Sequence, residues 1–227
     1  MDELVRVGRR STAALVADQL RVAIMRGEFR PGGQLGEVEL AGQLGVSRGP
    51  LREAMQRLVA EGLLRSERHR GIFVRDLDAE QVRDVYVARL AVEQAAGRLI
   101  LSAAPEVQAA AAEMLAGALA AMVAAARAKD AVAMADADQA FHATLVAASG
   151  SPRLRRMADG LLVETRMCLT ALQETAPPAD ELVVEHRALL DAVRSGDQAL
   201  LAARLESHMA GAVQRIAPEA AAASATG

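Results

Sequence analysis

Leu44-Gly-Val-Ser-Arg-Gly-Pro-Leu-Arg-Glu-Ala-Met-Gln-Arg-Leu-Val-Ala-Glu-Gly-Leu-Leu64 is the stretch that decides the fold of the N-terminal part of the chain. Ser47 is a good N-cap residue, and Pro50 falls in the first turn, where its missing N–H removes no hydrogen bond. A helix is therefore expected to begin near Ser47. Its apolar residues recur at helical spacing and predict a buried face made of Leu51, Met55, Leu58 and Val59.

The other face of this predicted helix carries Arg48, Arg52 and Gln56, whose long side chains donate hydrogen bonds. Just upstream, residues 37–44 predict a short helix, and Gly45 supplies the flexible residue needed for a tight turn between two steeply crossed helices. This order is typical of a helix-turn-helix. The polar face of the second helix is then free to bind a ligand.

A basic hairpin is predicted to follow the second helix. Residues 63–65 and 71–75 can pair as two short strands around Glu67-Arg68-His69-Arg70. A hairpin in this place is a wing, so residues 8–75 predict a winged helix-turn-helix domain.

These residues resemble the winged helix-turn-helix of the GntR family of bacterial transcription regulators over nearly all of residues 11–75. The motifs that carry the resemblance are Arg26-Gly-Glu-Phe-Arg-Pro-Gly-Gly-Gln-Leu35, Glu39-Leu-Ala41, Leu44-Gly-Val-Ser-Arg48, Leu51-Arg-Glu-Ala54, Glu61-Gly-Leu63 and Arg70-Gly-Ile-Phe-Val74. The resemblance implies that Ser47, Arg48, Arg52, Arg70 and Gly71 lie against double-stranded DNA, and the helix face adds Gln56.

One position departs from the pattern, since some FadR-like members carry arginine where this chain has Val38. The resemblance then implies that one DNA contact is absent or moved. A rival interpretation is that the pattern is a helix-turn-helix look-alike of the kind that occurs inside enzymes. Arg48 and Arg52 would then lie on a solvated helix face. The order of turn, capped helix and basic wing favours DNA binding.

The composition supports two domains of opposite charge. The chain has 227 residues, 52% of them hydrophobic and 24% charged, which is typical of a soluble globular protein. Residues 1–75 hold 13 Arg against 9 acidic residues, a net +4, and the remainder holds 13 Lys plus Arg against 20, a net -7. The basic part would attract phosphate and the acidic part would not.

The sequence predicts a cytoplasmic protein with no membrane partner. Only one cysteine is present, so no intrachain disulfide can form. The N-terminus carries Asp2 and Glu3 instead of a basic start, and the Ala-rich run 109–126 is interrupted by Glu113. Neither an export signal nor a membrane span is expected.

Residues 79–217 predict an antiparallel bundle of about six helices, which makes the chain mainly α. Residues 75–79 are the expected linker, and residues 218–227 are expected to be a disordered tail. The signals for helix starts are the Asp78/Gln81 capping box, Pro105, Asp130, Ser151-Pro152, Pro177-Pro178 and Asp197.

Four polar residues of the bundle are predicted to converge. Asp138 and His142 are four residues apart and project from one helix face. His186 lies 10 residues before Gly196 and His208 lies 12 after it, so an antiparallel hairpin brings both to nearly the same height.

One carboxylate oxygen and three imidazole nitrogens suit a divalent ion such as Zn, Ni, Mn or Co, with open positions for water or an anion. Taken singly, each histidine is better explained as a satisfied polar residue. Their joint spacing favours a metal site.

Residues 80–216 resemble the FCD effector-binding domain of the FadR subfamily. The motifs are Val87-Ala-Arg-Leu-Ala-Val-Glu93, Asp138-Gln-Ala-Phe-His142, Glu185-His186 and the late His208. The resemblance implies that Asp138, His142, His186 and His208 bind a metal and that a small organic acid is the effector. Members that sense acyl-CoA lack the full histidine set, so the chain is similar to the metal-containing branch.

Arg89 and Arg166 are the candidates for binding an effector carboxylate, because guanidinium offers a bidentate fork. The alternative is that either one pairs with Glu93 or Glu164.

The sequence thus predicts a homodimeric, ligand-responsive transcription repressor that binds a short inverted repeat. Two alternatives remain open. One is a metalloenzyme whose Asp and His side chains activate water, and the other is a module in which the ion only joins helices.

Overall fold

The computed structural model describes residues 11–171 and 178–217, without the side chains of residues 168–171. The chain divides into two compact units, Met1–Asp76 and Leu77–Gly227. The expected tail of residues 218–227 and Pro177 lie outside the described residues.

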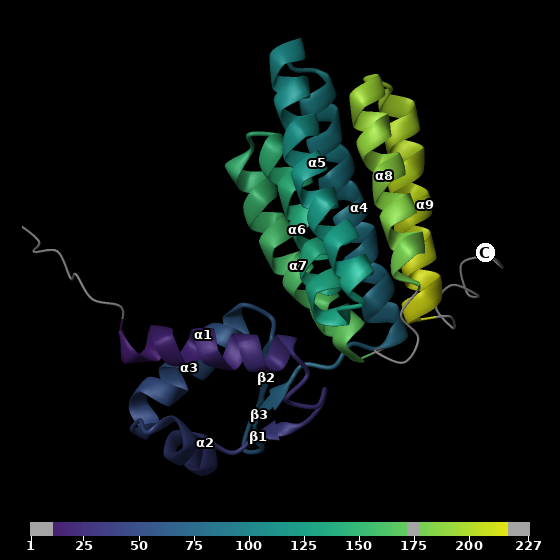
Figure 1. Cartoon of the computed structure of the whole chain (residues 1–227). Helices are drawn as coiled ribbons and strands as arrows, with labels where there is room; N and C mark the ends of the chain where they lie inside the picture. The colour runs from purple at the N-terminus through teal and green to yellow at the C-terminus, as the bar shows by residue number, and fades with distance from the viewer. Residues whose placement is uncertain (1–10, 172–177, 218–227) are drawn as a thin grey trace, which may run out of the picture. The chain divides into compact units, whose positions relative to one another are not determined.

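The first unit is a winged helix-turn-helix (Figure 1). Its elements are α1 (Thr12–Met25), β1 (Gln34–Leu35), α2 (Glu37–Leu44), α3 (Arg48–Ala60), β2 (Leu64–Glu67) and β3 (Gly71–Val74). Helix α3 packs on α1 and α2, and three of its four predicted core residues, Leu51, Met55 and Leu58, are fully buried. Val59 is only half-buried.

The turn between α2 and α3 lies where the sequence predicts it, between Gly45 and the N-cap residue Ser47. Gly45 ends α2 in the left-handed region at φ 63°, where glycine is favoured. Ser47 is the N-cap of α3 with extended backbone, yet its side chain makes no capping hydrogen bond. Ser47 thus occupies the N-cap position that the sequence predicts, with its side chain exposed.

The wing has one strand more than the sequence analysis predicted. Strands β2 and β3 pair antiparallel as expected, and β1 joins β3 on its other edge to give the order β1-β3-β2. The Gln34 Nε2 amide donates to the Arg70 carbonyl at 2.7 Å, so β1 also holds the turn of the hairpin. A two-residue strand carries too little pattern to be found from sequence.

The second unit contains six helices in the described residues, as expected. They are α4 (Ala79–Leu101), α5 (Pro105–Ala128), α6 (Ala131–Ala148), α7 (Pro152–Ala171), α8 (Ala179–Ser195) and α9 (Gln198–Ile216). The Asp78/Gln81 capping box and the Asp130 and Asp197 caps form as predicted, and Pro178 occupies the N-cap of α8. Figure 1 shows the helices side by side in a bundle.

Helix α4 is the centre of this bundle, because it packs against α5, α6, α7 and α9. It buries apolar residues such as Val92 and Ala96 but also Arg89 and Glu93. An ion pair on the central helix places two charges inside the bundle. Glu93 consequently lies beside the side chains that α6, α8 and α9 contribute.

Helix α5 is the one described helix whose length and composition would allow it to cross a membrane. A core helix of a soluble protein passes the same test. In this fold α5 packs on α6 and α8 and buries Ala111, Leu115, Leu119 and Met122.

A tight approach of α4 and α9 gives a first prediction. A Cβ added at Gly97 would lie 2.7 Å from Leu201 Cδ2, whereas one added at Gly117 meets nothing within 4 Å. Both glycines are inside helices, so alanine brings the same gain in helix propensity. Urea denaturation should show Gly97→Ala to be less stable than the Gly117→Ala control by about 1–3 kcal/mol. Equal free energies of unfolding would contradict this close packing.

Candidate functional site

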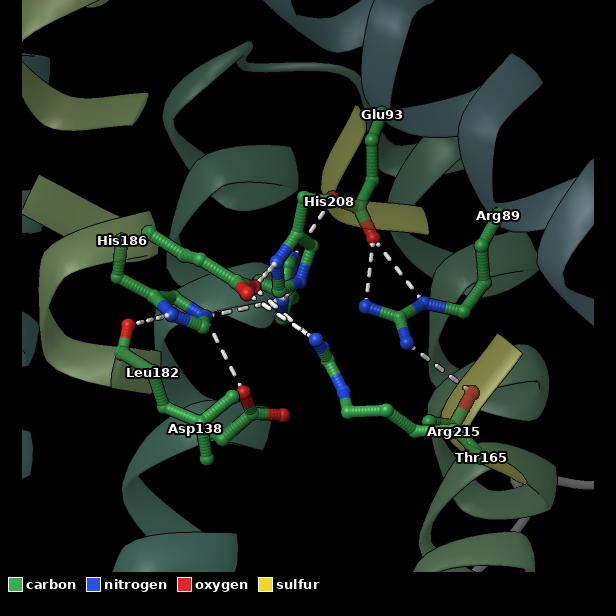
Figure 2. A network of polar contacts seen from close by, with 10 residues as sticks. Arg89, Glu93, Asp138, Thr165, Leu182, His186, His208 and Arg215 are labelled. Atoms are coloured by element: carbon green, nitrogen blue, oxygen red, sulfur yellow. Dashed lines mark hydrogen bonds and ion pairs between the residues drawn. The ribbon is translucent and has the colours of Figure 1, made fainter. Parts of the chain in front are cut away.

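The four predicted ligands converge inside the bundle. One donor atom from each of Asp138, His142, His186 and His208 lies within 4.8 Å of all the others. Asp138 and His142 are one turn apart on α6, and the α8–α9 hairpin around Gly196 brings His186 and His208 together. Figure 2 shows Asp138, His186 and His208 directed toward one centre.

The Nε2 atoms of the three imidazoles all face this centre. His142 Nε2 lies 3.1 Å from His208 Nε2 and 3.2 Å from His186 Nε2, and His186 Nε2 lies 3.1 Å from Asp138 Oδ1. The rings are almost completely buried, with His142 at 0% exposure.

Each imidazole is held from behind through its Nδ1 atom. His142 Nδ1 lies 2.7 Å from Glu93 Oε2, and His208 Nδ1 lies 2.8 Å from Glu185 Oε2. His186 Nδ1 donates to the Leu182 carbonyl at 2.8 Å. A carbonyl or an ionised carboxylate can only accept, so Nδ1 carries the proton in each ring and Nε2 points inward.

The outer carboxylates Glu93 and Glu185 were not predicted to hold the histidines. A local signal exists only for Glu185, which precedes His186 in the chain. Glu93 is 49 residues from His142, and the contact depends on how α4 packs against α6.

Donors of this kind fit a divalent ion. The lone pairs of His142 and His208 face each other at 3.1 Å, an arrangement that a shared cation stabilises. The outer acceptors fix the tautomer and raise the basicity of the rings, as is usual for metal-bound histidine. Three nitrogens and one oxygen, without sulfur, suit Zn, Ni, Mn or Co.

Electrostatics keeps the surrounding carboxylates ionised. Burial raises the pKa of Glu93, but the contact with His142 and the charge of Arg89 outweigh it and lower the pKa to about 2. The hydrogen bond from His208 lowers the pKa of Glu185 to about 2. Burial likewise opposes ionisation of Asp138, yet the contact with His186 lowers its pKa.

Of the histidines, His142 is held neutral, because burial lowers its pKa to about 4. For His186 burial acts in the same direction, but the contact with Asp138 prevails and raises its pKa.

The two candidate effector ligands, Arg89 and Arg166, are both buried beside carboxylates. Arg89 donates to Glu93 Oε1 from Nε at 3.2 Å and from Nη2 at 3.0 Å, and its Nη1 donates to Thr165 at 3.3 Å (Figure 2). Arg166 Nη2 lies 2.8 Å from Asp136 Oδ1. The pairing of Arg89 with Glu93 agrees with the alternative predicted from the sequence, and Arg166 pairs with Asp136.

The predicted DNA-binding residues lie on the surface of the first unit. Ser47 at the N-cap of α3 and Arg48, Arg52 and Gln56 on α3 are exposed, and Arg70 and Gly71 are exposed at the wing. The exposed face of α3 is therefore polar and basic, with its apolar face buried against α1.

Two acidic residues position arginines of this surface. Glu37 at the start of α2 accepts from Arg52 Nε at 2.7 Å, and Glu67 pairs with Arg70. Val38, next to Glu37, is 67% exposed, so the departure from the family pattern leaves an apolar side chain on this surface.

Comparison with known protein families agrees with the structure of both units. Residues 12–74 match the model of the bacterial regulatory proteins of the gntR family, and residues 84–211 match the FCD domain. The chain belongs to the GntR family. Its FCD domain places this GntR regulator in the FadR-like subfamily, as the resemblance implied.

Relatives of the GntR regulator are named as transcription regulators. It is 34% identical over 205 residues, covering 90% of this chain and 88% of the other, to a probable D-xylose utilization operon transcriptional repressor of Paenarthrobacter nicotinovorans. A second relative, at 32% identity over 84% of this chain and 79% of its own length, is an uncharacterized HTH-type regulator of Streptomyces ambofaciens. The GntR regulator is accordingly a DNA-binding protein and not an enzyme.

Solved structures support the same fold. A GntR transcriptional regulator from Rhodococcus sp. RHA1 superposes with a TM-score of 0.77 at 27% identity, covering 91% of this chain and 98% of that one. The E. coli McbR/YncC structure gives a TM-score of 0.75 at 24% identity over 93% and 99% of the two chains. At 24% identity, the similarity to McbR/YncC shows a shared fold only.

The buried Arg89–Glu93 pair gives a prediction on stability. Glu93→Ala leaves the Arg89 charge, which is 2% exposed, without this carboxylate and should cost about 3–5 kcal/mol. Glu185→Ala should cost about 1 kcal/mol, because Glu185 and Arg215 are partly exposed. Both are measured by denaturation with a chelator present, so that metal affinity does not contribute.

A double variant serves as the control for the Arg89–Glu93 pair. Arg89→Met with Glu93→Gln removes both buried charges, keeps an acceptor for His142 and should recover most of the lost stability. A smaller loss for Glu93→Ala than for Glu185→Ala would contradict a buried charge pair at Arg89.

Proposed function

We propose that this GntR regulator is a cytoplasmic, homodimeric repressor whose affinity for an inverted-repeat operator is controlled by a small organic acid at a divalent metal site. The observation that carries the proposal is the convergence of Asp138, His142, His186 and His208 in the same chain as an exposed basic recognition helix. The comparisons support DNA binding, and the relative named as a repressor supports repression.

The DNA part of the proposal assigns a role to each exposed residue. Arg48, Arg52 and Gln56 project from α3 toward base edges in the major groove, where guanidinium and amide groups distinguish base pairs. Ser47, Arg70 and Gly71 bind the backbone and adjacent groove. Two copies of the chain make the operator an inverted repeat.

DNA binding is tested by arginine substitutions. Arg48→Ala should weaken operator binding by about 1–3 kcal/mol and relax preference at one base position, whereas Arg70→Ala should weaken binding more uniformly. Arg57→Ala is the matched control, since Arg57 lies on α3 about 140° around the helix from Arg52 and pairs with Glu53. Selection from a random DNA library followed by titration measures both effects.

Failure to enrich any motif would refute sequence-specific binding. An Arg57→Ala protein as impaired as Arg48→Ala would refute the assignment of this helix face.

The metal part of the proposal rests on the fit of the donors. Asp138, His142, His186 and His208 would hold the ion, which when bound supplies positive charge and open positions for a carboxylate. Arg89 and Arg166 are the proposed second anchors for that carboxylate. For Arg89 this requires an exchange of partner, because its Nε and Nη2 atoms bind Glu93.

The effector would act by shifting an equilibrium between two arrangements of the helices. The four ligands belong to α6, α8 and α9, so an anion bound at their centre contacts several helices at once. It shifts the equilibrium only by its difference in affinity for the two arrangements. A coupling of about 1–3 kcal/mol, passed through the linker near residues 75–79, would change operator affinity by roughly 5–150-fold.

Elemental analysis of the purified protein tests the metal site. Wild type loaded with Zn, Ni, Mn or Co should bind about one ion per chain and gain about 2.7 kcal/mol of stability at a free ion concentration 100 times Kd. His186→Ala should lose both effects. His69→Ala is the control, because His69 is the one histidine outside the cluster and is exposed in the wing.

Absence of metal uptake under every loading condition would refute the metal site, as would normal uptake by His186→Ala. Either result leaves the DNA-binding proposal standing.

A further inference from the structure

A short network of charges surrounds the four ligands. Glu93 binds His142 and Arg89, and Glu185 binds His208 and Arg215. Together with the ligand Asp138, the network contains three carboxylates and two guanidinium groups, a net charge of -1 with neutral imidazoles. Figure 2 shows this network around the ring nitrogens.

Among the described residues of this domain, Arg166 is a further buried cation. It is paired with Asp136 at 2.8 Å and is counted apart from the five charged side chains of the network. The rings of His142 and His186 are acted on by charged side chains that include Glu93, Arg89, Asp138 and Glu185.

Net charge is costly at this depth. Asp138, Glu93 and Arg89 are all less than 10% exposed, and a charge transferred from water to such a site is stabilised only if opposite charges compensate it. A divalent ion changes the network from -1 to +1. A bound ligand with one negative charge then neutralises the site, whereas a ligand with two negative charges leaves it at -1.

We propose that the metal-loaded site selects monoanionic carboxylates over dianionic ones of the same size, because the Glu93 and Glu185 networks leave a single positive charge to neutralise. This inference rests on the proposed metal site. It assigns the outer carboxylates a role in specificity, in addition to holding the histidines. Removing one of them should move the preference toward dianions.

The test compares succinate with succinamate, its monoamide, which has nearly the same shape and one negative charge fewer. Calorimetric titration of the full-length protein saturated with Zn should give about tenfold tighter binding of succinamate. Glu93→Gln and Glu185→Gln each raise the net charge by one and keep an acceptor for the histidine. In both variants, saturated with Zn, the preference for succinamate over succinate should be smaller than in wild type, or succinate should bind more tightly.

Glu113→Gln is the matched control. It removes one negative charge from a position on α5 that is 79% exposed and lies 3.8 Å from Arg194. Its succinamate-to-succinate ratio should equal that of wild type, because charges separated by solvent are screened.

The outcomes separate this inference from the proposal on which it rests. Succinate binding to wild type as tightly as succinamate, or an equal shift in Glu113→Gln and Glu93→Gln, would overturn charge selection and leave the metal site intact. Zn uptake without binding of either acid would overturn both this inference and effector binding at the metal. Absence of Zn uptake would overturn the metal site itself.

Discussion

Three imidazole rings are each held at Nδ1 by an acceptor, and the geometry of the candidate metal site depends on that constraint. Each Nδ1 is held by an acceptor on another turn or helix, so each Nε2 faces the same buried point. The acceptors come from α4 and α8, and the rings from α6, α8 and α9. A change in the packing of any of these four helices therefore displaces a donor atom at the centre.

The local elements and the family could be predicted from the sequence, because their signals are short-range. The Asp78/Gln81 capping box, the Asp130 and Asp197 caps and the Pro105 start depend on a few neighbouring residues, and all form as expected. The convergence of His186 and His208 was also predictable, since a hairpin around Gly196 fixes their heights by counting residues.

What the sequence did not predict depends on contacts between distant segments. Strand β1 is defined by its pairing with β3 and not by its own two residues. The contact of Glu93 with His142 and that of Arg166 with Asp136 follow from the rotation of packed helices about their axes, which periodicity does not determine to within one side chain. Ser47 shows the converse case, in which a residue type suited to capping occupies the cap position without making the bond.

The contact between Gln34 and the Arg70 carbonyl has a consequence for the entropy of DNA binding. A two-stranded hairpin alone is marginally ordered in water, and ordering it on a partner costs conformational entropy. Here β1 adds a third strand, and the Gln34 amide binds the backbone at the turn where His69 is left-handed at φ 63°. The wing is thus already ordered by folding, and that part of the conformational entropy is not lost again when the domain binds DNA.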